Sequence, residues 1–202
     1  MLLLDPKTLQ PTEEQRIILD GITWQHYINL ADMFVDAFPR LTYLEGKLEI
    51  IMTTSPEHER LKKIIARLIE AYAEERDIEL NGYGNATFRR ETVARGAEPD
   101  ECYCLGELGE VPDIAIEIAL TSGGIDKLEV YQGLGVREVW FWQNNQLSFQ
   151  ILQPETGTYT QSDRSVLLPD LDPVLLVSYV NYSNQTQAIR VYRQALQNSH
   201  CI

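Results

Sequence analysis

An acidic residue interrupts an apolar run of the chain, DIAIEIAL at residues 113–120. The run alternates and is rich in isoleucine, which predicts a buried β-strand, and Glu117 stands inside it. A carboxylate that is buried without a partner is strongly penalised. The fold must therefore supply Glu117 with a compensating group, either an arginine in a structural ion pair or a cation in a functional site.

Helices and strands alternate along the rest of the chain. Apolar periodicity and N-cap residues predict helices over 23–35, 55–76 and 125–134, with one or two more between 172 and 197. Alternating apolar segments and glycine or asparagine turns predict strands within 41–53, 78–104, 113–120 and 136–153. This order is typical of an α/β or α+β fold, with a mixed sheet flanked by helices. We expect residues 1–22 to be an irregular lead-in and 23–202 to be a single domain.

Composition sets the class of protein. The chain has 202 residues, 44% of them hydrophobic, which is enough for a sizeable core without disulfides. It contains no run of eighteen apolar residues, so no membrane span is expected. Its N-terminus lacks the basic region of a signal peptide. Three cysteines, Cys102, Cys104 and Cys201, suit reduced thiols in a reducing compartment. We therefore expect a cytoplasmic protein.

A second carboxylate is positioned to meet Glu117. Side chains alternate across a strand, so Asp100 shares one face with Cys102, and Glu117 shares one face of the following strand with Ala115. If the two strands are neighbours, Asp100 and Glu117 converge. Two converging carboxylates repel each other, and a divalent cation resolves the conflict, since Mg²⁺ is commonly held by one or two carboxylates plus water and substrate phosphate.

Lys127 is the expected third member of this site. It lies early in the helix that follows the Glu117 strand, after a Gly123-Gly124 turn that would fold the helix back onto the sheet. Its charge could stabilise a phosphate in the transition state, and the N-terminal end of the helix favours phosphate too. Each residue also has a plain structural interpretation: Asp100 as a turn acid after proline, and Lys127 as solvated helix surface. The functional hypothesis depends on the combination.

The net charge of −13 argues against a broad nucleic-acid surface, because nucleic-acid affinity depends on neutralising phosphates with lysine and arginine. It permits a local basic rim. Arg89, Arg90 and Arg95 fall close together just before Asp100 and are candidates for such a rim. The alternative is that they are ordinary solvated loop charges.

Three segments together resemble a known family. They are EGKLEIIMTTSPEHERL at 45–61, EPD at 98–100, and the stretch from IEIA around Glu117 through IDKLEVYQGLGVREVWFW at 125–142. They resemble the Uma-two family of the PD-(D/E)XK restriction-endonuclease-like superfamily. The resemblance implies a restriction-endonuclease-like fold and a metal-dependent endonuclease that cleaves DNA with Mg²⁺ or Mn²⁺. It implies that Asp100 and Glu117 bind the metal and that Asp100, Glu117 and Lys127 are catalytic.

The chain departs from the family pattern in places. The superfamily's usual lysine, two residues after the strand carboxylate, falls at Ala119; in this family a lysine four residues before a helix tyrosine takes its place, which matches Lys127. The acid often found after the hairpin glycine is Lys47 here. Glu45 and His58 are candidates for contacts behind the metal ligands or with substrate.

Three hypotheses follow for function. The first is a metal-dependent DNA endonuclease, and the second is an inactive nuclease fold that binds nucleic acid or protein. The third is a hydrolase of another phosphate ester. A homodimer is expected if the protein cuts both strands, and the apolar VWFW segment at 139–142 is either a subunit surface or a buried core strand.

Overall fold

The fold consists of two β-sheets and the helices that cover them, seen in a computed structural model that describes residues 15–34, 39–53, 55–119 and 124–198. The first sheet, sheet A, has the strand order β1-β3-β2-β6-β5 and is antiparallel throughout. Its strands are β1 (Gln15–Leu19), β2 (Arg40–Leu44), β3 (Lys47–Thr53), β5 (Phe88–Arg90) and β6 (Arg95–Ala97).

The second sheet, sheet B, has the order β11-β10-β9-β8-β7-β4. Its strands are β4 (Leu80–Gly82), β7 (Glu101–Leu105), β8 (Ile114–Ile118), β9 (Glu138–Gln143), β10 (Gln146–Leu152) and β11 (Tyr159–Ser162). All neighbours are antiparallel except β8 and β9, which are parallel and are joined through helix α3 (Lys127–Leu134). A parallel pair needs such a crossover, and this one returns the chain across the face of the sheet that carries Glu117.

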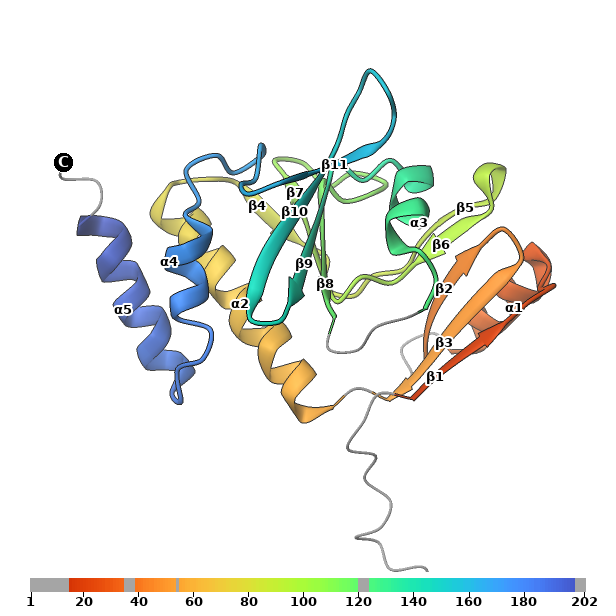
Figure 1. Ribbon diagram of the computed structural model, residues 1–202, viewed down its shortest axis with the longest axis horizontal. Coiled ribbons are helices and arrows are strands. Elements are labelled where there is room, and N and C mark those ends of the chain that lie inside the picture. Colours follow the sequence, from red (N-terminus) through yellow and green to blue (C-terminus); the bar gives the residue numbers. More distant parts are fainter. Residues whose placement is uncertain (1–14, 35–38, 54, 120–123, 199–202) are drawn as a thin grey trace, which may run out of the picture.

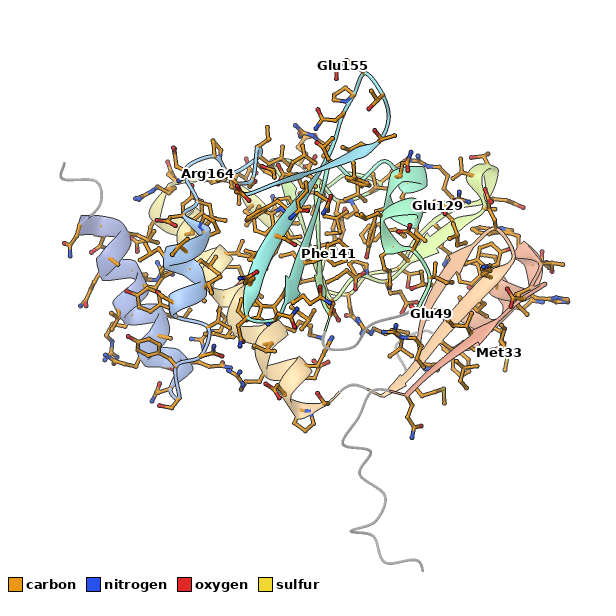
Figure 2. All side chains as sticks on the ribbon, viewed as in Figure 1. Met33, Glu49, Glu129, Phe141, Glu155 and Arg164 are labelled. Carbon is orange, nitrogen blue, oxygen red and sulfur yellow. The ribbon has the colours of Figure 1, made fainter. Side chains whose placement is uncertain are left out.

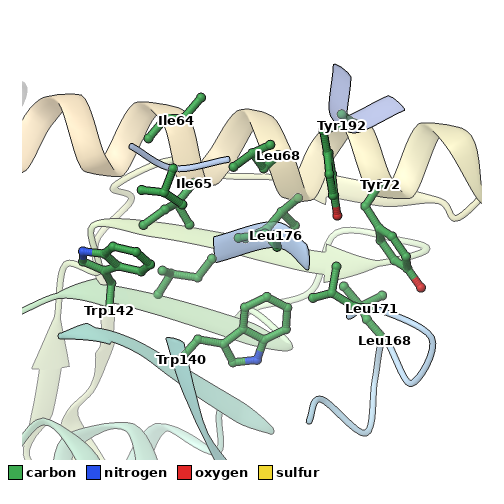
Figure 3. Packing of buried hydrophobic residues seen from close by; sticks show 14 of the residues in the cluster. Ile64, Ile65, Leu68, Tyr72, Trp140, Trp142, Leu168, Leu171, Leu176 and Tyr192 are labelled. Atoms are coloured by element: carbon green, nitrogen blue, oxygen red, sulfur yellow. The ribbon is translucent and has the colours of Figure 1, made fainter. Parts of the chain in front are cut away.

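Helix α2 (Pro56–Glu75) covers the opposite face of sheet B, together with α4 (Pro173–Ser178) and α5 (Gln185–Asn198) (Figure 1). Ser55 caps α2 by accepting a hydrogen bond from the backbone N–H of His58 at 3.1 Å. The apolar stripe of α2 packs against two tryptophans of β9 (Figure 3). The labelled side chains of this core are Ile64, Ile65, Leu68, Tyr72, Trp140, Trp142, Leu168, Leu171, Leu176 and Tyr192.

A second core lies between the two sheets. Helix α3 contributes Val130, Tyr131 and Leu134, which pack with Cys102 and Ala115 of sheet B and with apolar residues of sheet A. Helix α1 (Trp24–Met33) closes the far side of sheet A. The α3 face of sheet B is therefore covered by a helix and by the edge of another sheet, and the candidate site lies where these three elements meet.

The predicted mixed sheet flanked by helices is confirmed, with one addition: the strands divide between two sheets. Predicted helices at 23–35, 55–76 and 125–134 correspond to α1, α2 and α3. Their ends differ by at most two residues, and the predicted end at residue 35 lies outside the described residues. The β2–β3 and β9–β10 hairpins are where the sequence places them. Gly123 of the predicted Gly-Gly turn lies outside the described residues, whereas Gly124 lies within them.

The expectation that residues 1–22 form an irregular lead-in is wrong for residues 15–19. Residues 15–19 form β1, which pairs with β3 so that Ile17 lies opposite Ile50. Four of the five β1 side chains are exposed, so the strand lacks the alternation that identifies strands in a sequence. Pairing with β3 decides its structure. The division of the chain at residue 23 stays a prediction.

The burial of residues 139–142 decides between the two interpretations of that segment. The VWFW segment is a core strand: Val139, Trp140 and Trp142 are buried, so it offers the expected dimer no subunit surface. Among the described residues, no helix is long and apolar enough to cross a membrane.

Candidate active site

Asp100 is bound to β8 on both sides of Glu117. It stands one residue before β7, and its backbone N–H donates to the carbonyl of Ile116 at 3.1 Å. Its side-chain Oδ2 accepts the backbone N–H of Ile118 at 2.7 Å. The two carboxylates that the sequence predicts to converge therefore come from adjacent strands and line one cavity of about 370 Å³. Their position depends on the β7–β8 pairing and not on a flexible loop.

Half of the residues that line this cavity are charged. They come from sheet A, from sheet B and its flanking residues, and from the start of α3. Figure 2 labels one of them, Glu49, on sheet A near the start of α3. Three are cationic and four are anionic: Arg16, Arg40 and Lys127, and Glu49, Asp100, Glu117 and Asp126. A mixed cavity of this kind suits a ligand that combines a cation with an anion.

Asp100 is held in its ionised form. The carboxylate is 2% exposed, forms an ion pair with Arg40 through Oδ1, and lies 3.2 Å from His58 Nε2 through Oδ2. Burial alone would raise the pKa of Asp100, but the His58 hydrogen bond and the Arg40 charge outweigh it and hold the pKa at about 2. The same contact raises the pKa of His58, against the opposing effect of burial.

Glu117 shows the opposite behaviour. Burial and the negative charge of Asp100 raise its pKa, and the Lys127 ammonium, 3.4 Å from Oε1, offsets part of this. The hydroxyl of Tyr131 donates to the same oxygen, and burial raises the pKa of that hydroxyl, so it stays a donor. Among the described residues, Glu117 pairs with a lysine and a tyrosine of α3 and forms no ion pair with the arginine that the structural interpretation anticipated.

Lys127 reaches into the cavity. It is the first residue of α3, its side chain is 16% exposed, and its Nζ donates to Thr42 Oγ1 at 2.7 Å. Nζ lies 3.4 Å from Glu117 and 3.8 Å from Glu49. The interpretation of Lys127 as solvated helix surface is therefore wrong, because the crossover from β8 turns this end of α3 toward both sheets.

Comparison with known proteins identifies the family of the chain. A family model described as "Uma2: Putative restriction endonuclease" matches residues 24–181, a span that includes Asp100, Glu117 and Lys127. The chain belongs to the Uma2 family. A crystal structure from Anabaena variabilis, described as "a putative nuclease belonging to DUF820", covers 76% of this chain and 90% of its own, at 14% identity and a TM-score of 0.42. No curated protein matches the chain.

Glu49 also lines the cavity of this Uma2 protein, and it was not identified from the sequence. It lies on β3 and is 1% exposed. Its Oε1 accepts the backbone N–H of Ile125 at 3.3 Å and pairs with Arg16 at 3.4 Å. Its buried Oε2 lies 3.8 Å from Lys127 Nζ and accepts no hydrogen bond from the described part of the chain. The available signal was the one that marks Glu117, an acid within an apolar strand, here LEII at 48–51.

His58 and Glu45, the two residues proposed to contact metal ligands or substrate, lie in different surroundings. His58 is 1% exposed and contacts Asp100, so it stands directly behind a candidate ligand, as anticipated. Glu45 lies in the β2–β3 turn with a side chain that is 65% exposed and paired with Arg95. It does not line the cavity. Along this hairpin, Glu49 takes the place that the sequence suggested for Glu45.

The predicted basic rim is not present at the cavity. Arg95 is buried and pairs with Glu45 and Glu129, Arg89 pairs with Asp32, and Arg90 donates to the carbonyl of Gly133. Arg90 and Arg95 support the packing of α3 on sheet A, and Arg89 connects sheet A to α1. The cationic side chains that line the cavity are instead Arg16, Arg40 and Lys127, which lie far from one another in the sequence.

The N-terminus of α3 does not offer a free phosphate site. Asp126 is its N-cap, and the side chain accepts the backbone N–H groups of Leu128 and Glu129 at 2.9 and 3.3 Å. A capping carboxylate already offsets the partial positive charge at this end of the helix. Phosphate binding in the cavity would therefore depend on side-chain cations.

The donor set fits a magnesium ion held by two carboxylates. Asp100 and Glu117 present oxygen ligands on one wall of the cavity, and Mg²⁺ needs only one or two carboxylates when water and phosphate complete its shell. Within the described parts of the chain, no three side chains of His, Cys, Asp or Glu are grouped closely enough to hold a metal by themselves.

Proposed function

We propose that this Uma2 protein hydrolyses phosphodiester bonds of DNA, with Mg²⁺ or Mn²⁺ held by Asp100 and Glu117. The observation that carries the proposal is the double attachment of Asp100 to β8 around Glu117, which presents two carboxylates to a cavity shared with Lys127. Membership of a family described as restriction endonucleases supports nuclease chemistry. When bound, the cation would activate water and offset charge on the phosphate.

The remaining chemistry belongs to the chain's own side chains. Tyr131 and Lys127 hold Glu117 in place, and the Lys127 ammonium can donate to a phosphate oxygen as charge develops there. Ala119, where the superfamily usually has a lysine, lines the same cavity. Lys127 reaches that cavity from the next helix, so it can supply the positive charge that Ala119 lacks.

The alternative is a nuclease fold that binds nucleic acid or protein without cleaving. Two observations favour it: the net charge of −13, and the ion pair by which Arg40 neutralises Asp100. This alternative requires the same cavity but no metal-dependent turnover.

One comparison separates the two functions. Supercoiled DNA is incubated with Mg²⁺ or Mn²⁺ and either wild type, Asp100→Asn or Glu117→Gln, purified identically. The proposal expects cutting by wild type, none by either variant, and none with a chelator. Equal cutting by all three proteins would indicate a contaminating nuclease. If wild type neither cuts DNA nor binds the metal by calorimetry, the non-catalytic alternative replaces the proposal. Thermal melts show whether each variant is folded.

A further inference from the structure

Arg40 has a position that the hydrolytic scheme does not use. It is the first residue of β2, it is 9% exposed, and it lines the cavity. Its Nη1 pairs with Asp100 Oδ1, sixty residues away in the sequence. The guanidinium therefore stands at the oxygen that a cation would approach.

The two oxygens of Asp100 are not equally available. Oδ2 accepts the backbone N–H of Ile118, a group fixed by β8, and also faces the buried ring of His58. Oδ1 is engaged by Arg40, a side chain that lines the cavity. Each carboxylate oxygen has two lone pairs. Those of Oδ2 face Ile118 and His58, whereas Arg40 is the contact at Oδ1, so a cation at Oδ1 would lie beside the guanidinium and be repelled by it. Competition between the cation and Arg40 at Oδ1 follows.

A guanidinium displaced from a carboxylate suits phosphate. Its planar fork of N–H donors matches a phosphate as well as it matches a carboxylate. The cavity has a formal excess of one negative charge, and a divalent cation would turn this into an excess of one positive charge. Cation binding thus both weakens the pairing of Arg40 with Asp100 and makes the cavity attractive to an anion.

We propose that Arg40 is shared between two partners: it is the counter-ion of Asp100 in the metal-free protein and a ligand of the nucleic-acid phosphate once a cation occupies Asp100. This inference rests on the proposed function and deepens it. It makes the binding of cation and nucleic acid cooperative, and such coupling is reciprocal. It also explains how an acidic protein can bind nucleic acid at this site only when it is loaded with metal.

The first arm of the test contains no nucleic acid. Mn²⁺ is titrated calorimetrically into wild type, Arg40→Gln and Arg16→Gln. Arg16→Gln is the matched control, because Arg16 lines the same cavity but pairs with Glu49. Arg40→Gln should bind Mn²⁺ more tightly than wild type by a factor in the range of about 5 to 150, typical of coupled sites. The gain in Arg16→Gln should be clearly smaller, since it reports only the loss of one charge.

The second arm adds a DNA duplex in a Lys127→Ala background, which slows cleavage during the titration. The duplex should tighten Mn²⁺ binding to Lys127→Ala, and it should tighten that of Arg40→Gln/Lys127→Ala much less, because the phosphate can still complete the cation's shell but no longer meets Arg40. Equal tightening in both proteins would contradict the proposal. Should Arg40→Gln fail to fold, Arg40→Lys replaces it: the lysine keeps the charge but loses the fork, so competition with Mn²⁺ persists while the coupling to DNA falls.

Each outcome decides the matter. If Arg40→Gln binds Mn²⁺ no more tightly than Arg16→Gln, or if Arg40→Lys retains full coupling to DNA, the proposal is wrong. Absence of any effect of DNA on Mn²⁺ binding would overturn the phosphate role of Arg40. Failure of the proposed function looks different: both arms would succeed while wild type, with metal and DNA present, cuts nothing.

Discussion

Two hydrogen bonds to the backbone of β8 hold Asp100 beside Glu117. Asp100 donates to the carbonyl of Ile116 and accepts from the N–H of Ile118, so it contacts the residues on each side of Glu117. Relative movement of the two carboxylates would break the pairing of two adjacent strands in sheet B. This arrangement keeps two mutually repelling groups in place before any cation arrives, and several measurable consequences follow from it and from its surroundings.

Lys127→Ala should slow metal-dependent cleavage by about 10²–10³, the scale for losing one transition-state charge partner. Mn²⁺ affinity should not fall, because Lys127 is a cation and supplies no ligand. Cleavage rate and calorimetry measure the two effects separately. Lys62→Ala is the control, since Lys62 pairs with Glu59 on α2 and does not line the cavity. Cleavage by Lys127→Ala at the wild-type rate would remove Lys127 from the catalytic set.

Gly124→Ala should damage the site through a collision. Gly124 has φ +108°, and a Cβ there would overlap Glu49 Oε1 and lie 2.6 Å from Arg16 Nη1. Gly106→Ala is a matched control, because Gly106 also has positive φ (+73°) but nothing within 4 Å of the added atom. Gly124→Ala should lose about 1–3 kcal/mol more stability than Gly106→Ala, the usual cost of overpacking. Equal losses in urea unfolding would show that Glu49 and Arg16 move aside freely.

Ile65→Ala and Leu68→Ala should each cost about 2–5 kcal/mol of unfolding free energy, because both side chains are fully buried between α2 and sheet B. Urea denaturation measures the loss. Val174→Ala, at a side chain that is 78% exposed, should change stability by less than about 0.5 kcal/mol. An unchanged thermal melt for both core variants would mean that this face of α2 does not hold the sheet.

DNA binding by the metal-loaded protein should depend only weakly on salt. Three cationic side chains line the cavity, and the predicted rim arginines are engaged by other residues. Each neutralised duplex phosphate contributes about −0.9 to the slope of log K against log salt, so the slope should be shallower than about −3. Binding isotherms at several salt concentrations give this value. A steep slope would reveal a phosphate-binding surface outside the cavity.

The sequence alone determined the elements whose signals are local. Helix α2 follows from its Ser-Pro-Glu start and apolar stripe, and β8 follows from alternating isoleucines. The convergence of Asp100 and Glu117 could also be predicted, because alternation fixes which face a strand residue occupies once two strands are neighbours. Lys127 could be predicted as a neighbour of this pair from its position after the turn.

Only the tertiary structure decided what surrounds that pair. Arg40 and His58 reach Asp100 across sixty and forty-two residues of sequence, and Glu49 reaches the backbone of Ile125 across seventy-six. No local pattern encodes these distances, since they depend on how sheet A docks against α3 and sheet B. The same docking engages Arg90 and Arg95 with α3 and turns Lys127 inward. The packing of whole helices and sheets determines which charged side chains pair with each other. The electrostatics of this site therefore follow from the fold as a whole.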